Sequence, residues 1–219
     1  MQREDFRALE RLEVRWSEVD AQKVVFNAHY LSYADIALSN YWRRMALPYE
    51  ASFARLGGEL FARKATTHFH ASARYGDVLD VGIRCVGQGN TSLQFEVGIF
   101  RGLKLLNAVE LVYVFVDTKV HQPLALPQEL RDLITAYESG APMVRLRTGA
   151  WNELGRDAER LRTTVFVQEQ GVPREIEIDE LDPLALHAVA YNGLQLPVAT
   201  GRLVTAGAGV ARIGRMAVD

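Results

Sequence analysis

The chain has 219 residues, 48% of them hydrophobic, and a formal net charge of −2 at pH 7. This length suits one large domain or two small ones, and the weak charge argues against a dedicated nucleic-acid surface. A single cysteine, Cys85, excludes an internal disulfide and favours a reducing cytoplasm. The N-terminus is charged throughout and no apolar run approaches membrane-spanning length, so we expect a soluble, unexported protein with no membrane partner.

The predicted elements begin with a strand, a polar loop and a long helix. Val14–Val19 alternates apolar and polar residues as a strand does, and an irregular polar patch follows at Asp20–Lys23. From about Ala28 the apolar residues recur at helical spacing: Tyr30, Leu31, Ala34, Ala37, Leu38 and Tyr41. The carboxylate of Asp20 therefore stands directly ahead of a helix start.

The middle of the chain has the pattern of a β meander. Turn signals separate four predicted strands: Phe61–Ala73, Val78–Val86, Ser92–Arg101 and Leu106–Val116. A second helix is predicted over Pro127–Tyr137, with proline at its N-terminal position. A single sheet layer leaves an edge open, and alternating apolar residues of the last strand need a partner surface, so we expect at least a homodimer: Val109, Leu111, Tyr113 and Phe115.

The pattern changes near Ser139–Pro142, which predicts two domains, residues 1–139 and 140–219. The second part is predicted to hold a strand, a helix and three more strands: Val144–Arg147, Asn152–Thr164, His187–Tyr191, Pro197–Val204 and Ala211–Val218. An acidic stretch precedes the last three strands, and it is either a solvated surface loop or an attraction site for an amine: Glu175, Glu177, Asp179, Glu180 and Asp182.

The residues around Asp20 suggest acyl transfer to water. Backbone amides at the start of the predicted helix, around Phe26–His29, carry the positive end of its dipole and form a candidate oxyanion hole. Asp20 is placed to activate water or attack a thioester carbonyl, or else it only caps the helix. Asn27 and His29 either polarise the thioester or cap the helix and face solvent, and Glu18 is interpreted as a solvated charge at a strand end.

The segment D-A-Q-K-V-V-F-N-A-H-Y-L, from Asp20, resembles the active-site segment of hot-dog-fold acyl-CoA thioesterases of the 4-hydroxybenzoyl-CoA thioesterase type. That family carries D-x-x-G-[IV]-V-[YFW]-x-x-x-Y, and further similarity at Tyr75–Asp77 and Thr91–Leu93 extends the resemblance over residues 10–138. The resemblance implies an α+β hot-dog fold, an antiparallel sheet wrapped round a long helix. It also implies hydrolysis of acyl-CoA to a free acid and CoA, at the interface of a homodimer or homotetramer.

The same resemblance assigns roles to individual residues. It implies a catalytic group of Asp20, Asn27 and His29, and a substrate-binding group of Val25, Phe26, Tyr30 and Ser92. Ser92 alternatively only forms a turn at a strand start.

One departure from the family motif is Lys23, which stands where the family has glycine. A backbone conformation suited to glycine is then imposed on a residue with a Cβ. The lysine is either an exposed surface residue or a contact for a CoA phosphate. His68 and His70 share one face of their strand without a third ligand at suitable spacing, so no metal site is predicted, and the chemistry requires no cofactor beyond the acyl-CoA substrate.

The motif R-x-x-V-F-V-x-E-Q-G-V-P from Arg162, then E-x-D-x-x-D and A-x-H-x-V-A-Y, is similar to the amino-terminal half of GNAT-fold N-acetyltransferases. This implies a partial GNAT-like α/β segment over residues 144–219, in a bifunctional protein. In that fold the half that binds acetyl-CoA follows the strand resembling Ile213–Val218, so we expect a fragment of a longer protein without acetyltransferase activity of its own. Glu169 and His187 are interpreted as structural residues.

Two rival functions remain open at this point. The first is an acyltransferase whose hot-dog part is a non-catalytic acyl-CoA-binding or dimerisation module. The second is an acyl-CoA-binding protein without catalysis, which the lysine at position 23 favours. The preferred acyl chain depends on pocket depth, which no single residue reports.

Overall fold

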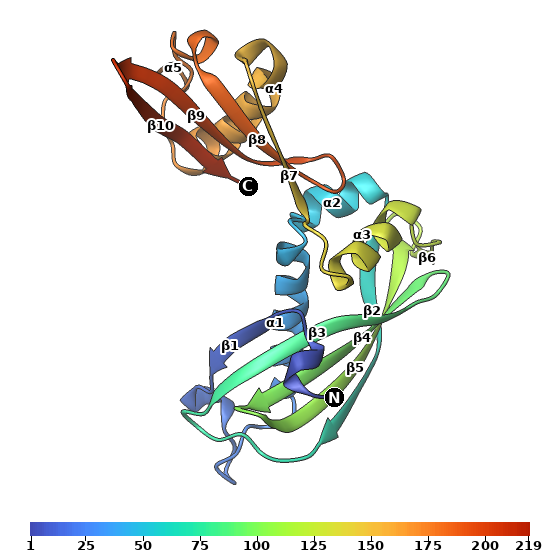
Figure 1. Ribbon diagram of the computed structural model, residues 1–219. Helices are drawn as coiled ribbons and strands as arrows, with labels where there is room; N and C mark the ends of the chain where they lie inside the picture. Colours follow the sequence, from blue (N-terminus) through green and yellow to red (C-terminus); the bar gives the residue numbers. More distant parts are fainter. The chain divides into compact units, whose positions relative to one another are not determined.

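The computed structural model describes residues Met1–Asp219, which divide into two compact units (Figure 1). Unit 1 contains Met1–Arg44 and Tyr49–Ala141, and unit 2 contains Met45–Pro48 and Pro142–Asp219. None of the helices combines the length and the hydropathy that a bilayer-spanning segment needs.

Unit 1 is an antiparallel sheet wrapped round one long helix, α1, which spans His29–Arg44 (Figure 1). The strand order is β1-β3-β4-β5-β2, and β6 pairs with β5. The strands have these bounds: β1 Leu9–Glu13, β2 Glu59–Phe69, β3 Val78–Gln88, β4 Ser92–Arg101, β5 Lys104–Asp117 and β6 Gln122–Pro123. The helix predicted from about Ala28 is thus confirmed, and the arrangement is the one that the family resemblance implies.

The core of unit 1 lies between α1 and the concave face of the sheet. The helix buries one face: Tyr30, Tyr33, Ala34, Ala37, Leu38, Tyr41 and Trp42. From the sheet, Val109, Leu111 and Phe115 are buried in the same core. The expectation that these strand residues need a second subunit to cover them is therefore wrong, because the chain's own helix does so. Each such side chain contributes about 1.5–3 kcal/mol through burial.

Two predicted strand boundaries in unit 1 are wrong for local hydrogen-bonding reasons. The strand lies at Leu9–Glu13 instead of Val14–Val19, where the chain instead forms a 3₁₀ turn at Trp16–Glu18. Strand β2 ends at Phe69, because the amides of His70 and Ala71 both donate to the carbonyl of Leu106, at 2.9 and 3.0 Å. These shared bonds turn the chain out of the β2–β5 ladder.

The remaining elements of unit 1 are two further α-helices and a short 3₁₀ turn near the N-terminus. Helix α3 (Gln128–Glu138) confirms the helix predicted over Pro127–Tyr137, with Pro127 as its N-cap residue. Helix α2 (Tyr49–Leu56) and the 3₁₀ turn Arg3–Asp5 carried no prediction.

Unit 2 is a four-stranded antiparallel sheet in the order β10-β9-β8-β7, with helix α4 (Trp151–Arg162) on one face. Its strands are β7 Val144–Gly149, β8 Leu186–Asn192, β9 Pro197–Gly207 and β10 Val210–Val218. The helix continues as a π-helical turn, Thr163–Glu169, and the short helix α5 spans Arg174–Glu177. A small core joins α4 to the sheet: Leu154, Ala158, Leu161, Val189 and Tyr191. The predicted helix and strands of this part are confirmed.

The acidic stretch of unit 2 is part of an ion-pair network, which contradicts the interpretation as a solvated loop. Glu177 and Asp182 are 2% and 1% exposed, and both contact the guanidinium of Arg162, at 2.6 and 2.7 Å. Arg202 pairs with Asp182 at 2.8 Å and with Asp179 at 2.6 Å, and hydrogen bonds from Arg202 lower the pKa of Asp179 to about 2. Because buried carboxylates require such partners, these three acids are not free to attract an amine.

Replacing Arg162 by methionine is expected to destabilise unit 2 by about 3–5 kcal/mol, since it leaves Glu177 and Asp182 buried without a countercharge. Hydrogen–deuterium exchange of the β8 peptide should accelerate accordingly. The matched control is Arg160→Met on the exposed side of the same helix, which should leave exchange within about twofold of wild type. Equal exchange in the two variants would contradict a structural role for the network.

Candidate functional site

Asp20 begins a tight turn in the loop that precedes α1, which starts at His29. Its amide donates to the carbonyl of Val24 and its own carbonyl accepts from the amide of Lys23, both at 2.9 Å. One carboxylate oxygen of Asp20 accepts the amide of Gln22 at 2.8 Å. Lys23 has a φ of 62°, in the left-handed region that glycine adopts freely, as the departure from the family motif predicts. The turn therefore keeps the geometry that a glycine would give.

A buried carboxylate, Glu18, fixes this turn on the helix. Glu18 is 3% exposed, so the interpretation as a solvated strand-end charge is wrong. Its carboxylate accepts the backbone amide of Arg15 at 2.7 Å, the Arg15 guanidinium at 2.7 Å and the hydroxyl of Tyr33 at 2.9 Å. The Glu18 carbonyl accepts the amide of Phe26 at 2.9 Å. Glu18, which precedes the Asp20 turn, is thus bonded to Phe26 after the turn and to Tyr33 in α1.

These contacts decide the charge state of the Glu18 carboxyl. Burial raises its pKa, but the hydrogen bonds from Arg15 and Tyr33 outweigh burial, and the net pKa is lowered. Burial and the bond to Glu18 raise the pKa of the Tyr33 hydroxyl, which remains the donor. Glu18 is therefore an anion at neutral pH.

Within Phe26–His29, two main-chain amides remain without a backbone acceptor. Of the predicted Phe26–His29 set, the amide of Phe26 donates to Glu18 and the amide of His29 donates to the carbonyl of Phe26, at 2.9 Å each. The amides of Asn27 and Ala28 make no such bond. The candidate oxyanion hole is therefore narrowed to these two donors, at the positive end of α1.

Asp20 and most of the predicted substrate residues line one cleft of about 400 Å³. The residues that line it come from the Asp20 turn, the start of α1 and the end of β2: Asp20, Gln22, Val24, Val25, Phe26, Asn27, Tyr30, Phe69, His70, Ala71 and Ser72. The predicted residues Asp20, Asn27, Val25, Phe26 and Tyr30 are thus brought together.

The walls of the cleft are partly apolar and firmly held. Tyr30 packs edge-on against Phe69, with ring centroids 5.5 Å apart, and its hydroxyl accepts the amide of Ala73 at 3.0 Å. The amide of Val25 donates to the carbonyl of Ala73 at 2.9 Å, which joins the Asp20 turn to the segment after β2. Phe26 and Phe69 are about half exposed and form an apolar rim.

Two predicted site residues do not line this cleft. His29 is partly buried and stacks edge-on against Phe26, with ring centroids 6.3 Å apart. Ser92 pairs with Val114, whereas the cleft adjoins Leu106 near the start of the same strand β5. Within one chain Ser92 and Asp20 therefore lie at opposite ends of the sheet.

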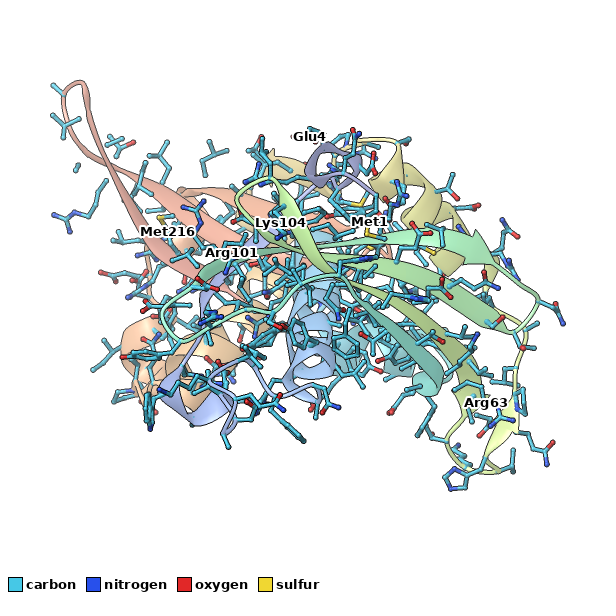
Figure 2. The ribbon with its side chains drawn as sticks, turned by 90° about the horizontal axis from the view of Figure 1, so that it is seen from below. Met1, Glu4, Arg63, Arg101, Lys104 and Met216 are labelled. Atoms are coloured by element: carbon cyan, nitrogen blue, oxygen red, sulfur yellow. The ribbon has the colours of Figure 1, made fainter.

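Figure 2 shows these two ends of the sheet. Arg101 and Lys104, which flank the turn between β4 and β5, lie together at one end, and the cleft adjoins this end through Leu106. Arg63 of β2 lies at the other end, where Ser92 begins β4.

Three polar residues of the cleft were missed by the sequence reasoning: Gln22, His70 and Ser72. His70 was considered only as a metal ligand with His68. The sequence pattern predicts His70 inside the strand Phe61–Ala73, whereas strand β2 ends at Phe69, one residue before His70.

The other candidate groups do not form a site. No three histidine, cysteine or acidic side chains gather in a way that could hold a metal ion, and His68 lies 4.0 Å from Glu110. In unit 2 the side chain of His187 is buried, and its Nε2 contacts the carbonyl of Asp182 at 2.9 Å, which fits a structural residue.

The cleft has the parts that acyl transfer to water requires. Asp20, which lines the cleft, can take a proton from water or attack a carbonyl. The amide of Asn27, which also lines the cleft, can bind the negative oxygen that develops, together with the amide of Ala28 next to it in the chain. An apolar rim suits an acyl group.

Comparisons with known proteins agree with this chemistry. A family profile described as the Thioesterase-like superfamily matches residues 14–134, more than half of the chain. The acyl-CoA thioester hydrolase YbgC of Escherichia coli is 30% identical over 118 residues, which cover 53% of this chain and 87% of YbgC. The structure of a thioesterase complexed with coenzyme A and Zn, from Thermus thermophilus, aligns with a TM-score of 0.56 at 26% identity, over 62% of this chain and 97% of that one. The curled sheet of unit 1 thus matches the hot-dog thioesterase fold.

A separate similarity concerns a smaller share of the chain. The uncharacterized N-acetyltransferase YjcF of Bacillus subtilis is 51% identical over 47 residues, which cover 22% of this chain and 33% of YjcF.

Replacing Glu18 by glutamine tests the anchor of the Asp20 turn. At pH 7 we expect the variant to lose about 1–3 kcal/mol of unfolding free energy, because the buried donors of Arg15 and Tyr33 lose their anionic acceptor. The pKa of Glu18 in the folded protein lies below the ordinary glutamate value of about 4.3. The stabilisation by the ionised carboxylate is therefore fully present above about pH 4.3, and it is lost as the pH falls through the lower pKa of the folded state.

Urea unfolding at pH 7 and at about pH 3 measures the effect, and the gap between wild type and Glu18→Gln should narrow at the lower pH. The matched control is Glu13→Gln, an exposed glutamate of β1, which should change little at either pH. A gap of equal size at both pH values would contradict the ionised anchor.

Proposed function

The chain belongs to the Thioesterase-like superfamily, and we propose on this basis that unit 1 hydrolyses acyl-CoA thioesters to a free acid and CoA at the Asp20 cleft. The observation that carries the proposal is the placement of one carboxylate, Asp20, in the same cleft as Asn27, whose backbone amide has no intramolecular acceptor. A carboxylate and a carbonyl-binding amide in one cleft are the two groups that thioester hydrolysis requires.

In the proposed reaction the thioester carbonyl oxygen accepts hydrogen bonds from the amides of Asn27 and Ala28. Asp20 then either takes a proton from the attacking water or attacks the carbonyl carbon itself. The negative oxygen that forms in either route is stabilised by the two amides and by the positive end of α1. The side chain of Asn27 is exposed at the cleft, and its proposed role is to hold the water. His29 acts only indirectly, by packing against Phe26.

The acyl group is proposed to lie against the apolar part of the cleft, formed by Val25, Phe26 and the ring of Tyr30. Ser92 lies at the far end of the sheet within one chain, so it reaches an acyl group at this cleft only from a second copy. Such a homodimer or homotetramer is also favoured by the open edge of β2, which pairs with β5 on one side only.

The proposed chemistry uses the acyl-CoA substrate and no metal or redox cofactor. We also expect the protein to work in a reducing compartment such as the cytoplasm, because its single cysteine, Cys85, is a free thiol.

Unit 2 is proposed to be a GNAT-type acyltransferase segment fused to the thioesterase. The support is the 47-residue similarity to YjcF, together with the motif that begins at Arg162. Arg162, at the end of α4, forms buried ion pairs with Glu177 and Asp182, so these two acidic residues have a structural role. No acetyl transfer is assigned to unit 2.

Replacing Asp20 by asparagine keeps the shape of the turn, including the acceptor for the amide of Gln22, and removes the base. We expect kcat for acyl-CoA hydrolysis to fall on the order of a hundredfold or more, while KM changes little. Release of free CoA thiol from a panel of short, long and aromatic acyl-CoAs provides the measurement.

The matched control is Asp132→Asn on the exposed face of α3, which should retain full turnover. Unchanged turnover in Asp20→Asn would refute the assignment of the base. Tight acyl-CoA binding by wild type without thiol release would instead support the acyl-CoA-binding alternative.

A further inference from the structure

One ionisable side chain in the Asp20 cleft has no part in the reaction described above. His70 lines the cleft from the segment that follows β2, whereas Asp20 lies before α1. The two residues are fifty positions apart in the sequence, and the hydrogen bonds of Val25 and Tyr30 to Ala73 join the two segments. The cleft therefore contains both a carboxylate and an imidazole.

The backbone of His70 is fixed while its side chain is free. Its amide and that of Ala71 both donate to the carbonyl of Leu106, so the chain leaves the β2–β5 ladder at this point. The imidazole of His70 is exposed at the cleft and makes no hydrogen bond or ion pair within the chain. By contrast, His68 lies near Glu110 and His187 contacts the carbonyl of Asp182.

The proposed reaction creates a need for a proton donor. When the carbon–sulfur bond breaks, its electron pair stays on the sulfur of CoA, and an alkyl thiol has a pKa of about 8.5. A general acid that protonates the sulfur as the bond breaks avoids the release of this basic thiolate. An imidazole titrates near neutral pH and is the side chain most often used as a general acid.

We propose that His70 is the general acid that protonates the departing sulfur of CoA, an inference that rests on the proposed hydrolysis at Asp20. Water forms the new bond to the carbonyl carbon and gives its proton to Asp20, while the carbonyl oxygen becomes negative. The carbonyl then re-forms, the carbon–sulfur bond breaks, and the sulfur takes a proton from the His70 imidazolium. The neutral imidazole then regains a proton from solvent, and Asp20 releases the proton that it took from water back to solvent.

Other residues of the cleft are less suited to this step. The hydroxyl of Tyr30 is buried, and burial raises its pKa, which makes it a weak acid. Asp20 is occupied as the base, and His29 does not line the cleft. His70 is the remaining general-acid candidate among the residues that line the cleft.

The test compares two thioesters of one acyl group that differ only in the leaving thiol. The first is the CoA ester, whose alkyl thiolate is the more basic leaving group and gains more from protonation. The second is an aryl thioester, whose arenethiolate is a much weaker base and departs without one. For His70→Gln we expect kcat with the CoA ester to fall about a hundredfold, and kcat with the aryl ester to fall by less than about threefold.

Two further variants separate this proposal from the proposed function. His68→Gln, two positions away on β2, should leave both esters unaffected, and Asp20→Asn should slow both. If His70→Gln slows both esters equally, or neither, His70 is not the general acid, although hydrolysis at Asp20 still stands. If Asp20→Asn hydrolyses both esters at the wild-type rate, the proposed function fails together with this step.

Discussion

The buried carboxylate of Glu18 is the interaction on which the site depends. An anion that is 3% exposed is tolerated only because Arg15 and Tyr33 supply donors to it, and the same residue's carbonyl holds the amide of Phe26. Glu18 therefore joins the segment before the Asp20 turn to Phe26 after it and to Tyr33 of α1, and this positions the turn at the cleft. The positive φ of Lys23 is maintained within this closed turn.

A second constraint places the opposite wall of the cleft. Strand β2 ends where two consecutive amides share the Leu106 carbonyl, and the following residues turn towards the start of α1. There Ala73 accepts the amide of Val25 and donates its own amide to Tyr30. The cleft is thus assembled from a turn before the helix and a turn after the strand, which explains how Asp20 and His70 come to share it.

Local patterns predicted the elements but not the buried charges. The spacing from Tyr30 to Tyr41 predicted most of the buried face of α1, although Leu31 of that set is exposed. The predicted bounds of strand β4 are the observed ones, because side-chain periodicity follows from backbone geometry. Glu18 was misread because its partner Tyr33 lies on the next element. The acidic residues of unit 2 were misread for the same reason, since Arg202 pairs with Asp182 across twenty positions. Burial of a charge depends on partners that only the fold brings together.

The central claim is that the amides of Asn27 and Ala28 bind the thioester carbonyl beside Asp20. The most direct measurement is the infrared difference spectrum of an acyl-CoA labelled with ¹³C at the carbonyl and bound to the Asp20→Asn variant. Strong hydrogen bonds from two amides weaken the carbonyl double bond, so the account predicts a thioester band at lower frequency than that of the free substrate in water. A bound substrate whose carbonyl band stays at the frequency of the free substrate would contradict it.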